Sequence, residues 1–303
     1  METVSFKRTS FIVNPLSGKL SLSKKVKILK RYFNAKNSEI IICNSPIKTA
    51  SKTCEEVKKG SLIVACGGDG TINIIASEVI RNKGVMAVCP MGRGNDFAKN
   101  IGITSFEKAA NAFLKKRCVE IKYLTLGFEN SQKGIGLTCA GVGMLSTAAF
   151  RATQIPILKG KLLYLTAAII SLFRLRTYVY KLKMDEKSLK FNSIIIVVAA
   201  GTYTGGGLPI APEANTHKNK LNLLVANSIG KLKALGLIRK VITGSHLNDP
   251  AVESSFGKSF KITTDSSDKY GKYVYADGEY LGDTPVKISI GKEPLKVLAS
   301  HFD

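Results

Sequence analysis

The stretch Ser61-Leu62-Ile63-Val64-Ala65-Cys66-Gly67-Gly68-Asp69-Gly70-Thr71-Ile72-Asn73 decides the fold of the N-terminal part of this chain. An apolar, β-branched run ends at a glycine-rich turn, and a helical pattern of apolar residues begins at Ile72. Strand, glycine turn and helix together expose backbone N–H groups at a helix N-terminus, where a phosphate can bind. Because an anion cradle gains nothing from a carboxylate, Asp69 indicates a metal ion or a proton as well. For this stretch alone, a tight turn without a ligand is the alternative.

The same alternation of strand and helix runs from residue 10 to about residue 120. Further strands are expected over 10–14, 39–43 and 85–89, and helices over 22–33, 49–59 and 104–116, the last with a Thr104-x-x-Glu107 capping box. Repeated βα units predict a doubly wound, mostly parallel α/β sheet with helices on both faces. Three glycine-bearing loops, 14–19, 67–71 and 92–96, each follow a strand. They should therefore converge at the carboxyl ends of the strands, where such sheets bind ligands.

After residue 120 the pattern changes to short strand-like runs separated by turns. These runs are 121–128, 134–139, 178–184, 193–200, 221–226, 259–264, 273–276 and 286–290. They predict an antiparallel, β-sandwich-like second domain with helical insertions over about 144–175 and 231–243, and a hairpin tip at 265–269. The expected domains are residues 1–122 and 123–293, with the last strand, about 294–303, returning to the first domain.

Composition limits the class of partner and of compartment. The 303 residues include 45 Lys and Arg against 22 Asp and Glu, a net charge of +23, which favours a nucleotide, a nucleic acid or an anionic membrane surface. Solvated basic faces are the plain alternative. No apolar run reaches the length of a membrane span, and the N-terminus lacks the apolar region of a secretory signal. Six cysteines without a C-x-x-C pair indicate reduced thiols in a cytoplasmic protein.

Four motifs, in order along the chain, carry a family resemblance. They are Asn14-Pro15-x-Ser17-Gly18-Lys19, Gly67-Gly68-Asp69-Gly70-Thr71, Gly94-Asn95-Asp96-Phe97-Ala98 and Asp277-Gly278-Glu279. Together they resemble the diacylglycerol kinase catalytic family, which includes soluble bacterial lipid kinases and sphingosine kinases and is distantly related to NAD kinases. The resemblance implies an ATP-dependent phosphotransferase of lipid metabolism and phospholipid biosynthesis, with an alcohol acceptor. It also implies an α/β nucleotide domain, a β-rich lipid domain, and a site in the cleft between them.

The resemblance assigns roles to individual residues. It implies a nucleotide-binding set of Asn14, Ser17, Asn44, Gly67, Gly68, Asp69, Gly70, Thr71, Asn73, Arg93 and Asn95. Asp69 and Asp96 would hold Mg²⁺ through water, as carboxylates on adjacent loops can, and would count with Glu279 as catalytic. Glu279 matches the general base that takes the proton of the lipid hydroxyl. A plain hairpin turn is the alternative for Asp277-Gly278.

Four positions depart from the family pattern. Arg93 stands where many members have a small residue, and could clamp a phosphate or fill part of the adenine site. Glu120 replaces a common aspartate, and Leu145 replaces an acidic residue. Lys218 replaces the aspartate ligand of a structural Mg²⁺ site, so we expect that site to be absent, with the lysine supplying the positive charge.

Diacylglycerol, giving phosphatidic acid, is the leading acceptor. An NAD kinase-like small-molecule kinase and a retired homologue that binds nucleotide or membrane are the alternatives. Basic residues flank the apolar stretch 162–173, namely Lys159, Lys161, Arg174 and Arg176. They favour docking at an anionic membrane surface, although an ordinary helix covering a core explains the apolar face equally well. We expect a cytoplasmic, peripherally membrane-associated protein with no nucleic-acid partner, and a homodimer is open.

Overall fold

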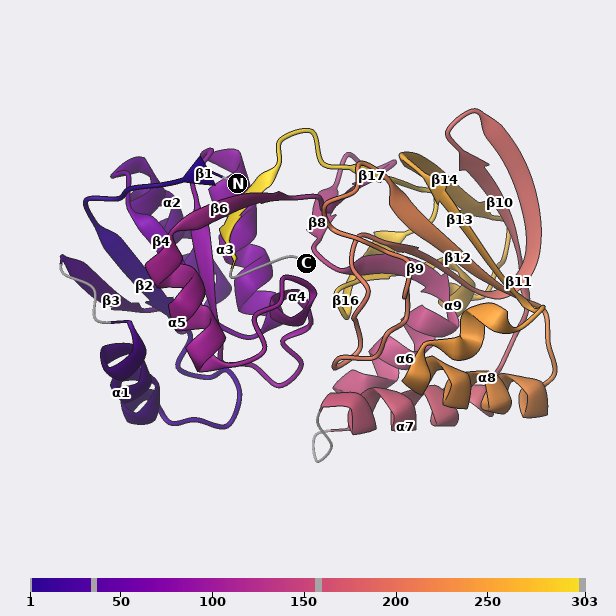
Figure 1. Cartoon of the computed structure of the whole chain (residues 1–303). Helices are drawn as coiled ribbons and strands as arrows, with labels where there is room; N and C mark the ends of the chain where they lie inside the picture. The colour runs from indigo at the N-terminus through magenta and orange to yellow at the C-terminus, as the bar shows by residue number, and fades with distance from the viewer. Residues whose placement is uncertain (1, 34–36, 156–159, 300–303) are drawn as a thin grey trace. The chain divides into compact units, whose positions relative to one another are not determined.

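The computed structural model describes residues 2–33, 37–155 and 160–299. The chain forms two compact units, which are described one at a time (Figure 1). Unit 1 comprises Met1–Ile121 and Lys292–Asp303, and unit 2 comprises Lys122–Gly291. Among the described residues, every helix is too short or too polar to cross a membrane.

Unit 1 is built on a twisted sheet whose central strands are parallel. In spatial order the described strands are β1 (Glu2–Thr3), β6 (Arg117–Ile121), β18 (Leu295–Leu298), β5 (Met86–Pro90), β4 (Leu62–Gly67), β2 (Thr9–Val13) and β3 (Ser38–Ile42). Strands β3, β2, β4, β5 and β18 run parallel, whereas β6 is antiparallel to both of its neighbours. The C-terminal strand β18 thus lies inside this sheet, between β6 and β5.

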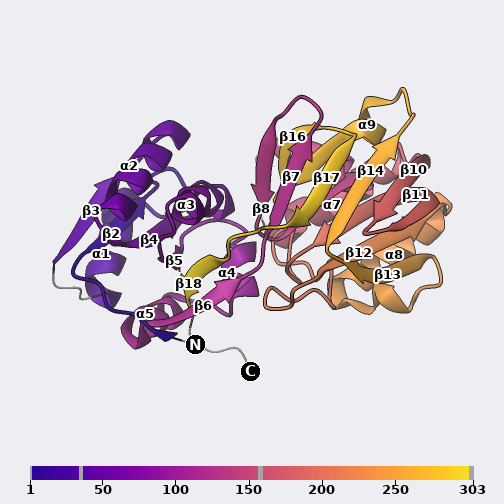
Figure 2. The same cartoon turned by 90° about the horizontal axis from the view of Figure 1, so that it is seen from above.

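Helices cover both faces of the unit 1 sheet, as Figure 2 shows, with α2 and α3 on one face and α1 and α5 on the other. Their bounds are α1 (Leu22–Tyr32), α2 (Pro46–Lys58), α3 (Asp69–Arg81), α4 (Asp96–Asn100) and α5 (Phe106–Lys115). Because both faces are covered, β2, β4 and β5 are buried at every position, as expected for parallel strands. This arrangement confirms the predicted doubly wound α/β fold.

An aromatic cluster packs α1 and α5 against one face of the unit 1 sheet. The rings of Phe11 on β2, Phe33 after α1 and Phe113 on α5 form a triangle with centroid separations of 5.4–6.2 Å. All three side chains are buried, so two helices and a strand share one apolar contact. One detail of α5 corrects the sequence prediction. Ser105, and not Thr104, is the N-cap, and its Oγ accepts a hydrogen bond from Lys108 N.

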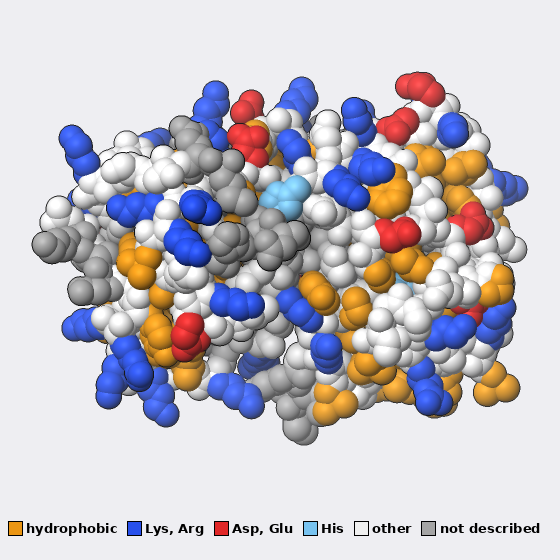
Figure 3. All heavy atoms as spheres, in the orientation of Figure 1, with side chains coloured by type: hydrophobic (Ala, Val, Ile, Leu, Met, Phe, Trp, Pro, Cys, Tyr) orange, Lys and Arg blue, Asp and Glu red, His pale blue; other side chains and the backbone are white. Residues whose placement is uncertain are grey.

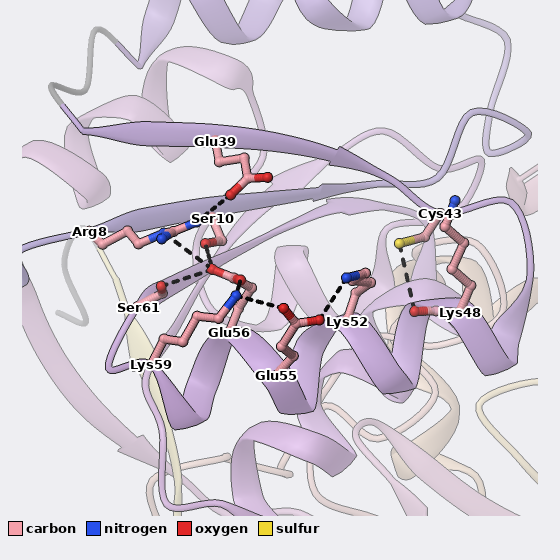
Figure 4. A network of polar contacts seen from close by, with 10 residues as sticks. All are labelled: Arg8, Ser10, Glu39, Cys43, Lys48, Lys52, Glu55, Glu56, Lys59 and Ser61. Atoms are coloured by element: carbon pink, nitrogen blue, oxygen red, sulfur yellow. Dashed lines mark hydrogen bonds and ion pairs between the residues drawn. The ribbon is translucent and has the colours of Figure 1, made fainter.

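A polar network lies at the amino ends of β2 and β4 in unit 1 (Figure 4). At its centre Glu56, buried on α2, accepts hydrogen bonds from Ser10 Oγ (2.6 Å) and Ser61 Oγ (3.1 Å). Its carboxylate also lies 2.8 Å from Lys59 Nζ and 3.4 Å from Arg8 Nε. Burial alone would raise the pKa of Glu56, but these hydrogen bonds and the Arg8 charge outweigh it and hold the pKa below its ordinary value. The network therefore ties α2 to β2 and to the start of β4.

Unit 2 is an antiparallel sheet wrapped around one core. The path of hydrogen-bonded strands is β16 (Glu279–Asp283), β15 (Tyr273–Ala276), β9 (Cys139–Gly143), β11 (Lys187–Ala199), β10 (Tyr178–Met184), β14 (Ser259–Thr264), β17 (Val286–Ile290), β7 (Leu124–Phe128) and β8 (Lys133–Gly136), with β12 (Leu221–Asn227) and β13 (Val252–Gly257) branching from β11. The long strand β11 has different neighbours along its length. Residues 187–193 pair with β10, and residues 195–199 pair with β9 and β12. Alternate residues of eight strands enter the same core, which requires the sheet to fold over on itself. The predicted sandwich-like domain is confirmed.

Helices α6 (Met144–Thr153), α7 (Gly160–Leu172) and α8 (Lys231–Thr243) are the two predicted insertions, the first of them split in two. Three strand-level predictions are wrong. The run 121–128 divides between β6 of unit 1 and β7, and the run 134–139 divides between β8 and β9. Residues 265–269 are not a hairpin tip. There Asp268 caps the short helix α9 (Lys269–Lys272), and β14 pairs instead with β10 and β17.

Candidate functional site

Three loops of unit 1 meet at the carboxyl ends of β2, β4 and β5. The parallel register aligns Val13 with Cys66, and Cys66 with Cys89, so the chain leaves all three strands at one level. Backbone hydrogen bonds continue this alignment into the loops, from Asn14 N to Cys66 O (3.0 Å) and from Met91 N to Gly67 O (2.8 Å). The convergence expected from the sequence is therefore present.

Glycines allow the backbones of these loops to touch. A Cβ on Gly92 would stand 2.3 Å from the Gly68 Cα, and a Cβ on Gly18 would stand 2.2 Å from the Met91 carbonyl oxygen. Gly18 also has a φ of +66°, which a side chain would strain. Any larger residue would separate the loops, so their close approach depends on these glycines.

Side chains then join the loops to one another. Asn14 Nδ2 donates to Thr71 Oγ1 at 2.9 Å, linking the loop after β2 to the first turn of α3. Asp69, the first residue of α3, accepts a hydrogen bond from Phe97 N at 3.1 Å, which links α3 to α4. Asp96, the first residue of α4, is buried and directly precedes Phe97 in the sequence. Two carboxylates thus stand at the starts of two joined helices.

Helix α3 supplies backbone donors at the same place. It begins at Asp69, and its first helical hydrogen bond runs from Ile72 N to Gly68 O. The N–H groups of the residues before Ile72 have no acceptor within the helix, which makes the start of this 13-residue helix suited to an anion. Asn73 follows in the same turn and is half-buried.

A buried lysine that the sequence did not single out supports the first loop. The Lys25 side chain on α1 is fully buried, and its Nζ lies 2.7 Å from Asn14 O, 3.0 Å from Pro15 O and 2.7 Å from Ser17 O. Its fourth acceptor is Ser17 Oγ at 3.1 Å, and that hydroxyl in turn donates to Asn14 O. Burial lowers the pKa of the Lys25 ammonium. The Lys25 ammonium therefore donates to three backbone carbonyl oxygens of the loop that carries Asn14 and Ser17. The signal that could have found it is its spacing from Leu22 and Leu29, which places Lys25 on the buried face of α1.

The remaining predicted residues of unit 1 differ in their surroundings. Asn95 has a left-handed backbone, and its Oδ1 accepts from Gly92 N at 2.8 Å, so the side chain shapes its own loop. Arg93 in that loop is exposed. Asn44 is exposed too and follows β3, whose register beside β2 puts it at the same end of the sheet.

In unit 2, the predicted base Glu279 is the exposed first residue of β16. The turn before it is held by Asp277, whose Oδ2 accepts from Leu137 N (2.6 Å) and whose Oδ1 accepts from Thr138 N (2.9 Å) and Thr138 Oγ1 (2.7 Å). Asp277 and Gly278 have φ values of +50° and +87°, as a tight two-residue turn requires. The carboxylate of Asp277 thereby fixes the position of Glu279 within unit 2.

The other three departures from the family pattern, at Glu120, Leu145 and Lys218, lie outside these loops. Leu145 packs in an apolar cluster with Val197 and Leu224, and Glu120 and Lys218 are exposed. Around Lys218 two loop carbonyls are already engaged, that of Ala214 by Thr202 Oγ1 (3.0 Å) and that of Thr216 by Lys122 N (2.7 Å). Neutral donors thus hold part of this loop, and the replacement of the structural ion by Lys218 stays a prediction.

The chain thus combines glycine-rich loops at one edge of a parallel sheet in unit 1 with a separate β-sandwich-like unit 2. Residues 8–126 match the family described as diacylglycerol kinase catalytic domain, and residues 138–299 match the YegS C-terminal NAD kinase beta sandwich-like domain. The chain therefore belongs to the YegS-like lipid kinase family, related to diacylglycerol kinases. This family membership makes it a phosphotransferase.

Individual relatives agree. The chain is 25% identical over 288 residues to the diacylglycerol kinase of Bacillus subtilis, covering 92% of each chain. It is 27% identical over 248 residues to the diacylglycerol kinase of Mycobacterium tuberculosis H37Rv, covering 80% of this chain and 78% of the relative. A crystal structure of a diacylglycerol kinase from Bacillus anthracis shares the fold with a TM-score of 0.73 at 19% identity, covering 98% of both chains.

A kinase of this family uses ATP as substrate, and typically a divalent metal. The donors in unit 1 fit such an ion, because Mg²⁺ binds through one or two carboxylates, substrate phosphates and water. Asp69 and Asp96 would supply the carboxylates. Among the described residues no three His, Cys, Asp or Glu side chains converge, so phosphate and water oxygens would complete the shell.

Proposed function

We propose that this protein is an ATP-dependent lipid kinase that transfers the γ-phosphoryl group of ATP to the hydroxyl group of diacylglycerol, giving phosphatidic acid. It would act from the cytoplasm as a peripheral protein at an anionic membrane surface, with no nucleic-acid partner. The observation that carries the proposal is the linking of three glycine loops of unit 1 through Asn14, Thr71 and Asp69. Such a rigid set of donors and carboxylates suits phosphoryl transfer, which depends mainly on positioning and electrostatic stabilisation.

The phosphates of ATP would bind at the start of α3. Backbone N–H groups from Gly68 to Thr71 would donate to their oxygens, with Asn14 and Ser17 held beside them by Lys25. Bound Mg²⁺ would neutralise negative charge on the phosphate oxygens. Asp69, which accepts a hydrogen bond from Phe97 N, would supply a carboxylate to that ion through water. Arg93, being exposed, is available to a phosphate or to the adenine edge.

Glu279 would act as the general base. Its carboxylate would accept the proton of the acceptor hydroxyl as that oxygen forms a bond to the γ-phosphorus and the bond from phosphorus to the bridging oxygen of ADP breaks. The products are a lipid phosphate, ADP and a proton on Glu279. Asp277 positions the base through the hydrogen bonds that it accepts from residues 137 and 138.

The experiment is transfer of labelled phosphate from ATP with Mg²⁺ to diacylglycerol in mixed micelles, alongside a lipid extract read by mass spectrometry. We expect labelled phosphatidic acid, and a loss of at least a hundredfold in turnover for Glu279→Gln. Labelling of a different lipid would keep the kinase and replace the acceptor. If no lipid accepts phosphate from the wild type, the proposal is wrong.

The same preparation tests the two alternatives. The Gly67–Thr71 turn is shared with NAD kinases, so NAD is offered as an acceptor and NADP is measured directly. A retired homologue would bind ATP and transfer phosphate to no acceptor. Formation of NADP would assign the protein as an NAD kinase. ATP binding without phosphate transfer would assign it as a retired homologue.

A further inference from the structure

Two neighbouring helices of unit 2, α7 and α8, present an unusual outer surface. They contact one another, and Figure 1 shows them side by side along the lower edge of unit 2. The side chain of Lys231 at the start of α8 donates from Nζ to the carbonyl of Phe173 just after α7, at 3.1 Å. The pair therefore forms one continuous face.

The α7 side of this face is apolar and exposed. Leu162, Ile169 and Phe173 are 59%, 42% and 77% exposed. Leu162 and Ile169, seven residues apart, lie on one side of α7, and Phe173 directly follows the helix. Ala167 and Leu172 are buried. An ordinary helix covering a core would turn its large apolar residues inward, so the stripe is not accounted for by packing within unit 2.

The α8 side repeats this arrangement. Leu232, Leu235 and Ile242 are 88%, 40% and 43% exposed. Ala234 and Leu237 are buried against the sheet side of the helix. Two adjacent stripes of exposed leucine, isoleucine and phenylalanine make a patch of the kind that marks a binding surface.

Positive charge surrounds the patch. Neither helix contains Asp or Glu. The basic residues of the two helices and of the segment directly after α7 are Lys161, Arg174, Arg176, Lys231, Lys233, Arg239 and Lys240. The acids facing them are Asp249, 2.8 Å from Lys240 and 3.9 Å from Lys233, and Asp268, 2.8 Å from Arg176. Figure 3 shows orange and blue side chains intermixed in the lower right of the view, where Figure 1 has α7 and α8. Lys159, expected to flank the stretch 162–173, lies outside the described residues.

We propose that the face formed by α7 and α8 docks on a bilayer that contains anionic phospholipid. Exposed apolar side chains with basic residues among and beside them match the two layers of such a surface, which are acyl chains and negative headgroups. A second copy of this chain is the poorer partner, because it brings the same basic face and a net charge of +23. The inference names the membrane partner of the proposed lipid kinase, and it extends the predicted docking segment from α7 alone to both helices.

The test is co-sedimentation with vesicles, without nucleotide, so its outcome is independent of kinase activity. We expect binding to phosphatidylglycerol–phosphatidylcholine vesicles at least tenfold tighter than to phosphatidylcholine alone, weakening as salt rises. Leu232→Glu should weaken binding at least tenfold. Ile47→Glu is the matched control, since Ile47 is 83% exposed on α2 of unit 1, and it should change binding less than twofold. Arg239→Gln should cost roughly fivefold, the effect of about one juxtamembrane charge.

Results of two kinds would overturn the inference. One is equal binding of the wild type to both kinds of vesicle or an unchanged affinity for Leu232→Glu. The other is a protein that sediments as a dimer and becomes monomeric in Leu232→Glu, which would give the face to a second copy. Turnover of a short-chain, water-dispersed diacylglycerol by Leu232→Glu should equal that of the wild type. Failure of that assay in both proteins would count against the kinase proposal and leave the vesicle result standing.

Discussion

The two ends of the parallel strands in unit 1 each bury a charged side chain, and they satisfy it with different partners. At the amino ends, Glu56 is met by the charges of Lys59 and Arg8 and by two serine hydroxyls. At the carboxyl ends, Lys25 is met by three backbone carbonyls and one hydroxyl of a single loop. The Glu56 network joins α2, β2 and the start of β4. The Lys25 ammonium holds only the loop after β2, and it leaves a positive charge beneath that loop.

This difference separates stability from binding. A carboxylate surrounded by cations is neutralised where it lies, so the amino-end network has no charge left for a ligand. An ammonium held by neutral carbonyls keeps its net charge, and in a loop next to the start of α3 that charge favours an anion. The fold thus places its structural ion network and its proposed phosphate site at opposite ends of the same strands. Substitutions at the two ends should therefore have different consequences.

The largest effect is expected from Asp69→Asn. The amide oxygen can still accept from Phe97 N, so the fold should be retained while the carboxylate charge is lost. We expect kcat/KM for phosphate transfer to fall roughly 10²- to 10³-fold, as for removal of one preorganised electrostatic group. Steady-state kinetics with circular dichroism as a folding check measure it. Glu56→Gln, at the other end of the strands, is the control and should retain wild-type turnover at 25 °C.

Glu56→Gln should instead lower the free energy of unfolding, by about 3 kcal/mol, because it removes one partner of a buried charge network. Urea unfolding measures the change. The matched control is Glu55→Gln on the same helix, whose carboxylate binds Lys52 and Lys59 at 2.6 Å and whose side chain is 42% exposed, against 2% for Glu56. It should leave the urea midpoint unchanged, as exposed ion pairs generally do. Equal destabilisation by both variants would contradict the role given to burial.

Lys25→Met should combine both kinds of effect at smaller size. Without the ammonium the carbonyls of Asn14, Pro15 and Ser17 lose their common donor, which should cost about 2 kcal/mol of stability. Because the loop then loosens, we expect KM for ATP to rise several-fold more than kcat falls. Lys27→Met, at an exposed position on the same helix, should change neither quantity. A purely structural lysine would lower stability and leave KM for ATP unaltered.

The smallest effect is a pH dependence of the Glu56 contribution. The folded pKa of Glu56 lies below its ordinary value of 4.5, so the folded state holds fewer protons than the unfolded state as pH falls through this range. The stability gap between the wild type and Glu56→Gln should therefore be constant from pH 7 to 5. It should shrink as pH falls below about 4.5 and through the folded pKa. Urea midpoints at pH 7, 5 and 3.5 measure it, and a gap that widens on acidification would reverse the assigned sign.

Much of the fold follows from periodicity, and the loops follow from their composition. The runs 178–184 and 259–264 became strands with the predicted bounds, and 231–243 became a helix with the predicted bounds, because each is delimited by turn residues. Strand β13 was missed, since Val252-Glu-Ser-Ser-Phe-Gly shows little alternation and forms by pairing with β12. Tertiary pairing overrides local pattern in such segments.

At the candidate site the sequence could name residue types and could not foresee their partners. The glycine loops were predictable, because glycine clusters after strands are typical of ligand loops in α/β folds. Burial of Lys25 was indicated only by its helical spacing from Leu22 and Leu29. Because lysine is usually solvated, the place of its ammonium beneath the loop became apparent only from the packing of α1. The hydrogen bond that the Asn95 side chain accepts from Gly92 N within its own loop was not foreseen, and its role in nucleotide binding stays a prediction. The catalytic and binding roles themselves stay predictions until the variants above are assayed.

The place of β18 in the unit 1 sheet has a consequence for synthesis of the protein on the ribosome. The strand lies between β6 and β5, yet roughly 170 residues separate it from β6 in the sequence. At about 5–20 residues per second, those residues take on the order of 10–35 s to translate. During that interval the nascent unit 1 has its glycine loops but an open slot in its sheet. Ribosome-stalled chains ending before residue 295 should therefore be protease-sensitive in unit 1, and become resistant once β18 has emerged.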